Sequence, residues 1–285
     1  MTRSLAIPEP QTPATFLTSN FAGADDLLGA GQTGALARAG PVSVVRTGRI
    51  GPLIEIVVAR RAAPDAYAQV TIEAPFAATI DHALDHRQAS GLDKGNRSGV
   101  FPLIELGSEG EQIDVWRHWL SRADQAAKAA GFPDRTAAEL IGALGELEDN
   151  VFRHSQAYET GLAAYAASAL GFEMVVCDGG CGVLASLRSN PGYADLQDAG
   201  EALRVAVADG QSRLGRDSGA GYGMGQMFRA LANHDGDLRF RSDDHALEVR
   251  GHSLQGELKL THVAPLPGLT ISALCRPSPR ASGTV

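Results

Sequence analysis

The sequence has few cysteines and no long apolar segment, and both absences narrow the class of protein. Its 285 residues include three cysteines, at positions 177, 181 and 275, an odd number without the spacing of a disulfide framework. The longest mostly apolar stretch, residues 161–177, is interrupted by Gly171 and Glu173 and does not read as a membrane-spanning helix. The N-terminus lacks the apolar segment of a secretory signal. We therefore expect a cytoplasmic protein in a reducing compartment.

An excess of basic residues is also missing. The chain carries 25 Lys and Arg against 33 Asp and Glu, a formal net charge of −8. This balance gives no broad attraction to nucleic acid or to anionic membranes, and the pair Arg60-Arg61 is too short to change it. We expect neither as a partner. A hydrophobic content of 44% at this length allows a sizeable core.

The first 110 residues predict two segments of different character. Residues 1–40 are rich in Pro, Thr, Ala and Gly and predict an irregular lead-in with one short helix. Residues 41–110 predict a small α/β domain, whose chemistry the sequence does not reveal. We expect its helix at 77–86 and its strands at 42–45, 53–58, 68–72 and 100–106.

Residues 111–280 predict a second domain with helices over a mostly antiparallel sheet. An amphipathic helix over 112–131 stops at Gly131 and Pro133. Thr136 and Glu139 have the spacing of a capping box, which opens a second helix that runs to about Ser155. Further along we expect helices at 196–209 and 224–233 and strands at 172–177, 237–241, 247–249, 257–262 and 269–274.

The second helix carries the first candidate site residues. Glu146, Asn150 and Arg153 follow one another at spacings of four and three, so they share one face of the helix. A carboxylate and an amide one turn apart suit a hydrated Mg²⁺, which prefers oxygen ligands and keeps several waters. By themselves these three residues are more typical of a solvated helix face.

Two glycine-containing turns supply the other candidates. Asp178-Gly-Gly-Cys-Gly182 follows an apolar strand, where an aspartate can accept a hydrogen bond from an exocyclic amine and glycines let a flat base approach the backbone. Gly219-Ala-Gly-Tyr-Gly-Met-Gly225 precedes a helical run and presents backbone N–H groups to an anion. This second turn lacks the Gly-Lys-Ser/Thr of a Walker A loop.

Together, the order of these motifs resembles the GHKL (histidine-kinase-like) ATPase superfamily over residues 112–276. Glu146–Ser155 is similar to its N box, Asp178–Gly182 to its first glycine box and Gly219–Met224 to its second. Leu266–Ser272 resembles its last strand. The resemblance implies an α+β protein whose C-terminal part is a two-layer α/β sandwich, the Bergerat-type ATP-binding fold, with a mixed sheet and helices on one face.

The resemblance also implies a role for each residue, with ATP and Mg²⁺ as cofactors. Glu146 would be the general base or the group that orients a water, Asn150 the Mg²⁺ ligand and Asp178 the acceptor for the adenine amine. Leu269 stands where the family has threonine, so Thr270 must substitute or a water must bridge. The segment 183–218 would be the lid. The remaining contacts are Arg153, Arg213 or Arg216, Gly219, Gly221 and Gly223 at the phosphates, and Gly180 and Gly182 at the base.

The fold hosts several activities, so the activity depends on what surrounds the site. A sensor histidine kinase needs a phosphoacceptor histidine on a helical hairpin, and here one helix with His118 precedes the domain. A transducer domain after the last strand is not expected. The sequence is nearest the anti-sigma-factor serine kinase type, which predicts a signal-transduction ATPase or serine/threonine kinase acting on a regulatory partner protein. A nucleotide-switched binding module and an atypical histidine kinase stay open as alternatives, as does a homodimer.

Overall fold

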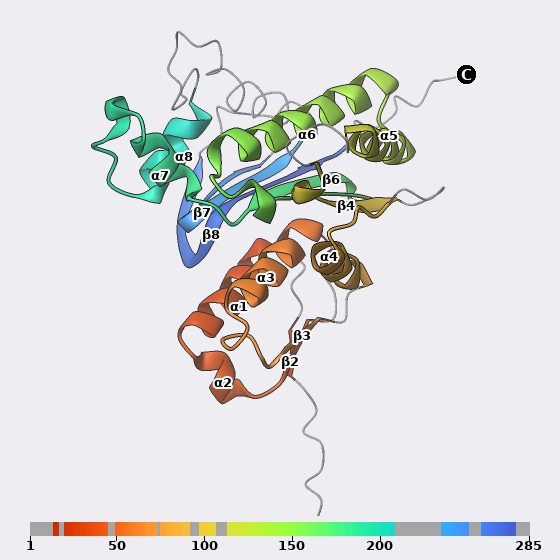
Figure 1. Cartoon of the computed structure of the whole chain (residues 1–285). Helices are drawn as coiled ribbons and strands as arrows, with labels where there is room; N and C mark the ends of the chain where they lie inside the picture. The colour runs from red at the N-terminus through yellow and green to blue at the C-terminus, as the bar shows by residue number, and fades with distance from the viewer. Residues whose placement is uncertain are drawn as a thin grey trace, which may run out of the picture.

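The fold comes from a computed structural model, which describes residues 14–16, 20–44, 49–72, 75–91, 97–106, 113–208, 235–250 and 258–277. Two sheets organise these residues, a three-stranded sheet near the N-terminus and a five-stranded sheet in the middle of the molecule (Figure 1). Helices pack between and around them. The α+β class predicted from the sequence is confirmed.

The N-terminal unit alternates strands and helices. Its three short strands are parallel and lie in the order β1-β2-β3. Parallel neighbours need a connection that crosses over, and helices supply it here. The unit consists of β1 (Ala14–Phe16), α1 (Phe21–Gln32), α2 (Ala35–Ala39), β2 (Val42–Val44), α3 (Ile50–Ala62), β3 (Val70–Ile72) and α4 (Pro75–His86).

The five-stranded sheet is antiparallel at every described pairing and has the order β4-β5-β6-β8-β7. Its strands are β4 (Ser98–Pro102), β5 (Leu162–Ser168), β6 (Gly171–Asp178), β7 (Asp237–Arg250) and β8 (Lys259–Cys275). The helical elements of this half are η1 (Leu103–Leu106), α5 (Ile113–Ala129), α6 (Asp134–His154), η2 (Tyr158–Thr160), α7 (Gly182–Arg188), η3 (Pro191–Tyr193) and α8 (Ala199–Val207).

The expected mixed sheet is wrong, because every described pairing is antiparallel. The helices of this half, α5 to α8, lie on one face, and helices of the N-terminal unit cover the other. We call the face toward α5 to α8 the front face, and Val176 and Ile271 lie in its core. The back face lies against α3 and α4 of the N-terminal unit, and Leu162 and Cys177 lie in that core (Figure 1). Since side chains alternate along a strand, the residues of β6, of β7 before Asp243 and of β8 after Gly268 can each be assigned to one face.

Helix α3 corrects the prediction of a strand at 53–58. Its residues from Ile50 to Val57 are all buried, because the helix packs on the five-stranded sheet on one side and on α1 and the parallel strands on the other. A helix buried all round loses its amphipathic pattern. Its short apolar run then looks like that of a buried strand.

Several element boundaries also differ from the predictions. Helix α6 begins at Asp134 with Pro133 as N-cap, so Thr136 lies inside the helix and forms no capping box. Residues 98–102, expected in the small domain, pair with β5 in the five-stranded sheet. Three or four C-terminal strands were expected, but β7 and β8 form one long hairpin with register shifts at Asp243. The helices expected at 77–86 and 112–131 are confirmed as α4 and α5. None of the described helices is long and apolar enough to cross a membrane.

Candidate functional site

The C-terminal end of α6 meets the turn that follows β6, and this contact is the centre of the candidate site. The Cys181 N–H donates to the Ser155 carbonyl at 2.9 Å, and the Gly179 N–H donates to Thr160 Oγ1 at 2.8 Å. A Cβ placed on Gly180 would lie 2.1 Å from the Ser155 oxygen. Only glycine allows the backbone to approach this closely. The structure therefore brings two sequence motifs, 146–155 and 178–182, into direct contact.

Asp178 ends β6 as a buried carboxylate at this turn, with 4% of its surface exposed. Val176 faces the front, so alternation directs Asp178 to the front face as well. Its Oδ1 accepts from the Gly180 N–H at 2.8 Å. Burial raises the pKa of Asp178 to about 6, although hydrogen bonds from the backbone N–H groups of Gly180 and Leu269 oppose the rise. A carboxylate is thus kept in a place that disfavours its charge.

The β7–β8 hairpin forms the wall behind this turn. Ser242 Oγ accepts from the Val183 N–H and donates to the Gly268 carbonyl, both at 3.0 Å. Gly268 has a φ of +77°, and a Cβ on it would lie 2.0 Å from the backbone carbonyl oxygen of Asp178. Gly182 has a φ of +71° and would meet Ser242 Oγ at 2.9 Å. Glycine is required at both positions by conformation and by space.

As predicted, Glu146, Asn150 and Arg153 share one face of α6, and some of their polar atoms already bind groups of the same helix. Glu146 and Arg153 are exposed and Asn150 is half-buried. Asn150 Nδ2 donates to the Glu146 carbonyl at 2.9 Å, which leaves Asn150 Oδ1 as the atom that can bind a cation. Arg153 forms an ion pair with Asp149 at 2.6 Å on its own helix.

The acidic neighbours on α6 do not simply face solvent. Glu148 is half-buried and accepts from the Tyr158 hydroxyl at 3.1 Å. Burial raises the pKa of Glu148, and the hydrogen bond from Tyr158 partly offsets the rise. Because Asp149 pairs with Arg153, Glu146 is the carboxylate of this group that stays exposed beside Asn150.

The structure does not bring Thr270 to Asp178. Leu269 is the residue opposite Asp178 in the ladder, and Thr270 lies opposite Cys177. Ile271 points into the front core, so its neighbour Thr270 points to the back face with Cys177. The expectation that Thr270 substitutes for a threonine at the base is therefore wrong. Ser242 occupies the corresponding front-face position on β7, and no pattern in the sequence singled it out.

Several predicted phosphate contacts lie outside the described residues. These are Gly219, Gly221, Gly223, Arg213 and Arg216, together with the helix expected at 224–233. Across the residues that are described, no group of three or more His, Cys, Asp or Glu side chains is arranged to hold a metal ion. A Mg²⁺ held by one amide oxygen and phosphates does not need such a group.

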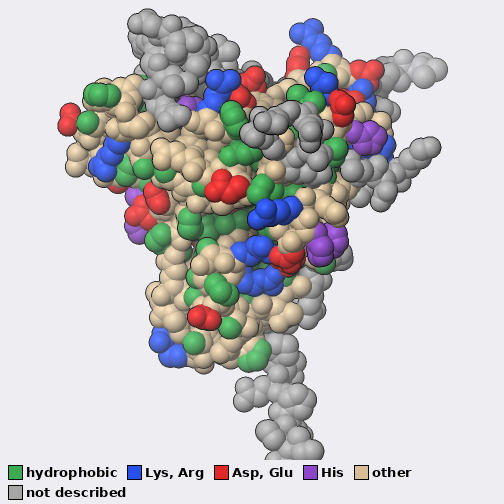
Figure 2. Space-filling view, viewed as in Figure 1, with side chains coloured by type: hydrophobic (Ala, Val, Ile, Leu, Met, Phe, Trp, Pro, Cys, Tyr) green, Lys and Arg blue, Asp and Glu red, His purple; other side chains and the backbone are tan. Residues whose placement is uncertain are grey.

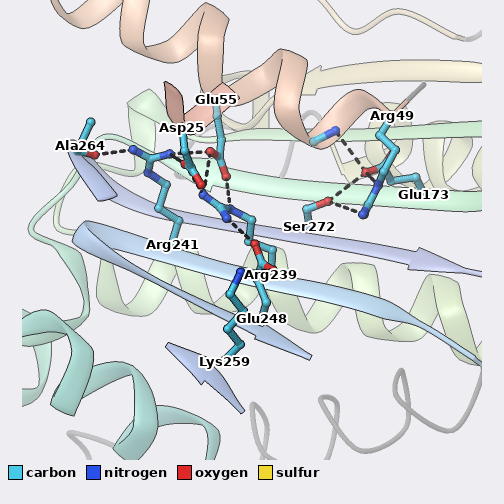
Figure 3. A network of polar contacts seen from close by, with 11 residues as sticks. Asp25, Arg49, Glu55, Glu173, Arg239, Arg241, Glu248, Lys259, Ala264 and Ser272 are labelled. Carbon is cyan, nitrogen blue, oxygen red and sulfur yellow. Dashed lines mark hydrogen bonds and ion pairs between the residues drawn. The ribbon is translucent and has the colours of Figure 1, made fainter. Parts of the chain in front are cut away.

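Sequence reasoning missed a network of buried charges on the back face (Figure 3). Arg239 and Arg241 of β7 are almost fully buried and both bind Glu55 of α3, at 2.9 and 2.6 Å. Asp25 and Glu248 complete the pairing of the two arginines. Buried guanidinium groups need such partners, since an unpaired buried charge is costly. The network joins the N-terminal unit to the sheet.

Glu173 makes a second connection between the same two parts. It lies on β6, five residues before Asp178, and its Oε2 accepts from the Ile50 N–H at 2.7 Å. Its Oε1 accepts from Gly51 N–H, Arg49 Nε and Ser272 Oγ at 3.0–3.2 Å. A carboxylate from the sheet thus caps the N-terminus of α3, which it stabilises through the helix dipole.

A groove of about 890 Å³ lies away from the α6 contact, between α1 and the β7–β8 hairpin. Asp25, Arg49, Glu248 and Lys259 are among its lining residues, and none of the predicted site residues lines it. Acidic and basic side chains are interspersed over the face of the molecule shown in Figure 2. Neither the groove nor the mixed surface charge points to the nucleotide binding predicted from the sequence, so the contact between α6 and the Asp178 turn remains the candidate site.

Comparisons with protein-family models, with curated proteins and with solved structures give no match for this chain.

Proposed function

We propose that residues 111–280 form a GHKL-type fold that binds ATP and Mg²⁺, and that the chain is a serine/threonine kinase-like regulator of a partner protein. The observation that supports this most is the direct contact between the end of α6 and the glycine turn carrying Asp178. The sequence motifs that resemble the N box and the first glycine box therefore meet in space, as a nucleotide site requires.

The residues at this contact fit a purine and a divalent cation. Asp178 offers a buried carboxylate as acceptor for an exocyclic amine, and the missing Cβ of Gly180 lets the turn that carries Asp178 lie directly against the Ser155 carbonyl. Asn150 Oδ1 would bind Mg²⁺, which when bound neutralises charge that develops on the transferred phosphoryl group. Thr270 has no part in this proposal.

Glu146 is the residue proposed to move the proton. The hydroxyl of a partner serine or threonine gives its proton to the Glu146 carboxylate, while its oxygen forms a bond to the γ-phosphorus. The bond from that phosphorus to the β–γ bridging oxygen breaks, and ADP leaves with the electron pair. The exposure of Glu146 fits a group that must reach a partner's side chain.

Helix α5 favours a kinase-like regulator over a histidine kinase. Trp116 and Trp119 stack on each other in the front-face core, with ring centroids 5.2 Å apart, so α5 belongs to the layer that covers the sheet. His118 lies on its exposed side. In a histidine kinase the phosphoacceptor helix would instead form a hairpin of its own.

Labelling with γ-labelled ATP and candidate partner proteins tests the activity. We expect wild type to label a serine or threonine, and Glu146→Ala to bind Mg·ATP without labelling. Glu139→Ala, an exposed change on the same helix, is the matched control and should label normally. Equal labelling by Glu146→Ala would refute the role of Glu146 as the general base. Tight ATP binding without any transfer or hydrolysis would favour the nucleotide-switched binding module.

A further inference from the structure

The strand pair behind the proposed adenine site is irregular around Asp243, and the two residues before it, Arg241 and Ser242, hold that irregularity. In the β7–β8 ladder Ser242 pairs with Leu269, Asp243 with Leu266 and His245 with His262, so the register shifts on both sides of Asp243. Asp243 has a φ of +50°, and the extra β8 residues bulge from the ladder. Bulges of this kind redirect side chains and backbone and often lie beside functional sites.

Arg241 and Ser242 secure the bulge from opposite faces. Arg241 Nη2 donates to the Ala264 carbonyl on the back face, and Ser242 Oγ donates to the Gly268 carbonyl on the front face. The Gly268 carbonyl lies in the shift between Leu266 and Leu269, and the Ala264 carbonyl in the shift between His262 and Leu266. Arg241 is in turn fixed by Glu55 at 2.6 Å and Asp25 at 3.0 Å, both from the N-terminal unit (Figure 3).

The bulge lies directly against Asp178, the proposed hydrogen-bond acceptor for the adenine amine. Gly268 packs against the Asp178 backbone so closely that a Cβ would lie 2.0 Å from its oxygen. The next residue, Leu269, donates its backbone N–H to the Asp178 carboxylate. Any shift of the bulge therefore changes where the Asp178 carboxylate points and which donor it meets.

We propose that Arg241 is a positioning residue for the nucleotide base, acting from the back face through the β7–β8 bulge on Asp178. This inference rests on the proposed function. The N-terminal unit, through Glu55 and Asp25, then contributes to nucleotide recognition without touching the nucleotide. The planar fork of arginine holds two carboxylates and a carbonyl at fixed, separate positions, a geometry that the three N–H donors on the single nitrogen of lysine do not reproduce.

Arg239 supplies a matched control on the same strand and face. It is as buried as Arg241 and binds Glu55, Asp25 and Glu248, but its hydrogen bonds all go to carboxylates and none to the bulged segment. We expect Arg239→Lys and Arg241→Lys to lower the free energy of unfolding alike. Only Arg241→Lys should raise the Kd for Mg·ATP at least tenfold and reduce the preference for Mg·ATP over Mg·GTP at least fivefold.

The inference is overturned if Arg241→Lys keeps the wild-type Kd within twofold, or if Arg239→Lys weakens binding as much. If Arg241→Lys does not fold, amide hydrogen exchange of the wild-type protein, measured with and without Mg·ATP, tests the inference instead. Mg·ATP should slow exchange of the amides at 241–243 and 266–269 at least fivefold and leave 237–239 unchanged, and no slowing at 266–269 overturns the inference. A wild-type chain that binds no Mg·ATP refutes the proposed function itself, which is a distinguishable result.

Discussion

Replacing Asp178 with asparagine separates a binding role of this residue from a structural one. Asparagine has nearly the same shape, and its Oδ1 can still accept from the Gly180 N–H as the carboxylate does at 2.8 Å. The change removes the buried charge. If Asp178 exists to recognise a ligand, the variant should lose the ligand and keep the fold.

The size of the effect follows from the pKa of the carboxyl. It is about 6 in the folded protein against an ordinary value of 3.8, because burial disfavours the charged form. The difference corresponds to about 3 kcal/mol that the ionised group costs the folded state. This cost is complete above pH 6, declines as the pH falls and is absent below 3.8. We expect Asp178→Asn to unfold with a free energy about 1–3 kcal/mol above wild type at pH 7.5, since the amide NH₂ also needs partners.

Urea unfolding at pH 7.5 and pH 5.0 measures this, with calorimetry of Mg·ATP binding on the same samples. The stability advantage of the variant should shrink at pH 5.0, where wild type is largely protonated, while its Kd for Mg·ATP stays at least tenfold above the wild-type value at pH 7.5. Asp124→Asn, on α5 and away from the site, controls for charge removal. A variant less stable than wild type at pH 7.5, or one that binds Mg·ATP normally, would refute the reasoning.

Three further predictions follow from the same contacts. The affinity of wild type for Mg·ATP should fall about tenfold per pH unit below pH 6 as Asp178 is protonated, and Asp178→Asn should show no such dependence in calorimetry. Gly180→Ala should weaken binding at least tenfold and cost about 1–3 kcal/mol in urea unfolding, since its Cβ meets the Ser155 oxygen. Gly179→Ala, whose Cβ would sit 3.4 Å from its nearest neighbour, should stay within about 0.5 kcal/mol of wild type. Glu173→Gln should lower the free energy of unfolding by about 1–3 kcal/mol because α3 loses its charged cap, and an unchanged urea midpoint would contradict that role.

Elements with an exposed face were predictable from the sequence. In α6, Leu140, Leu144, Leu147 and Val151 are buried at helical spacing, and the helix lies where this pattern placed it. Helix α3 is buried on all sides from Ile50 to Val57, so its apolar run predicts a strand instead of a helix. Strand β5 was missed because its alanines have little preference for strands.

Residues of the candidate site were predictable from the sequence where they belong to a motif within a single segment. Asp178 and Gly180 stand in a short motif, and the structure brings that motif to the end of α6. Ser242 and Arg241 act across the sheet, from a strand some sixty residues away, so their roles depend on pairing register. The misplacement of Thr270 has the same cause, because a shift of one residue along a strand reverses the face.

A crystal structure of wild type grown with Mg²⁺ and a non-hydrolysable ATP analogue would show where the nucleotide binds. We expect the exocyclic amine of adenine within about 3 Å of Asp178, with Mg²⁺ bound by Asn150 Oδ1. An analogue bound elsewhere, such as in the groove beside Asp25 and Lys259, with the Asp178 turn empty, would contradict it.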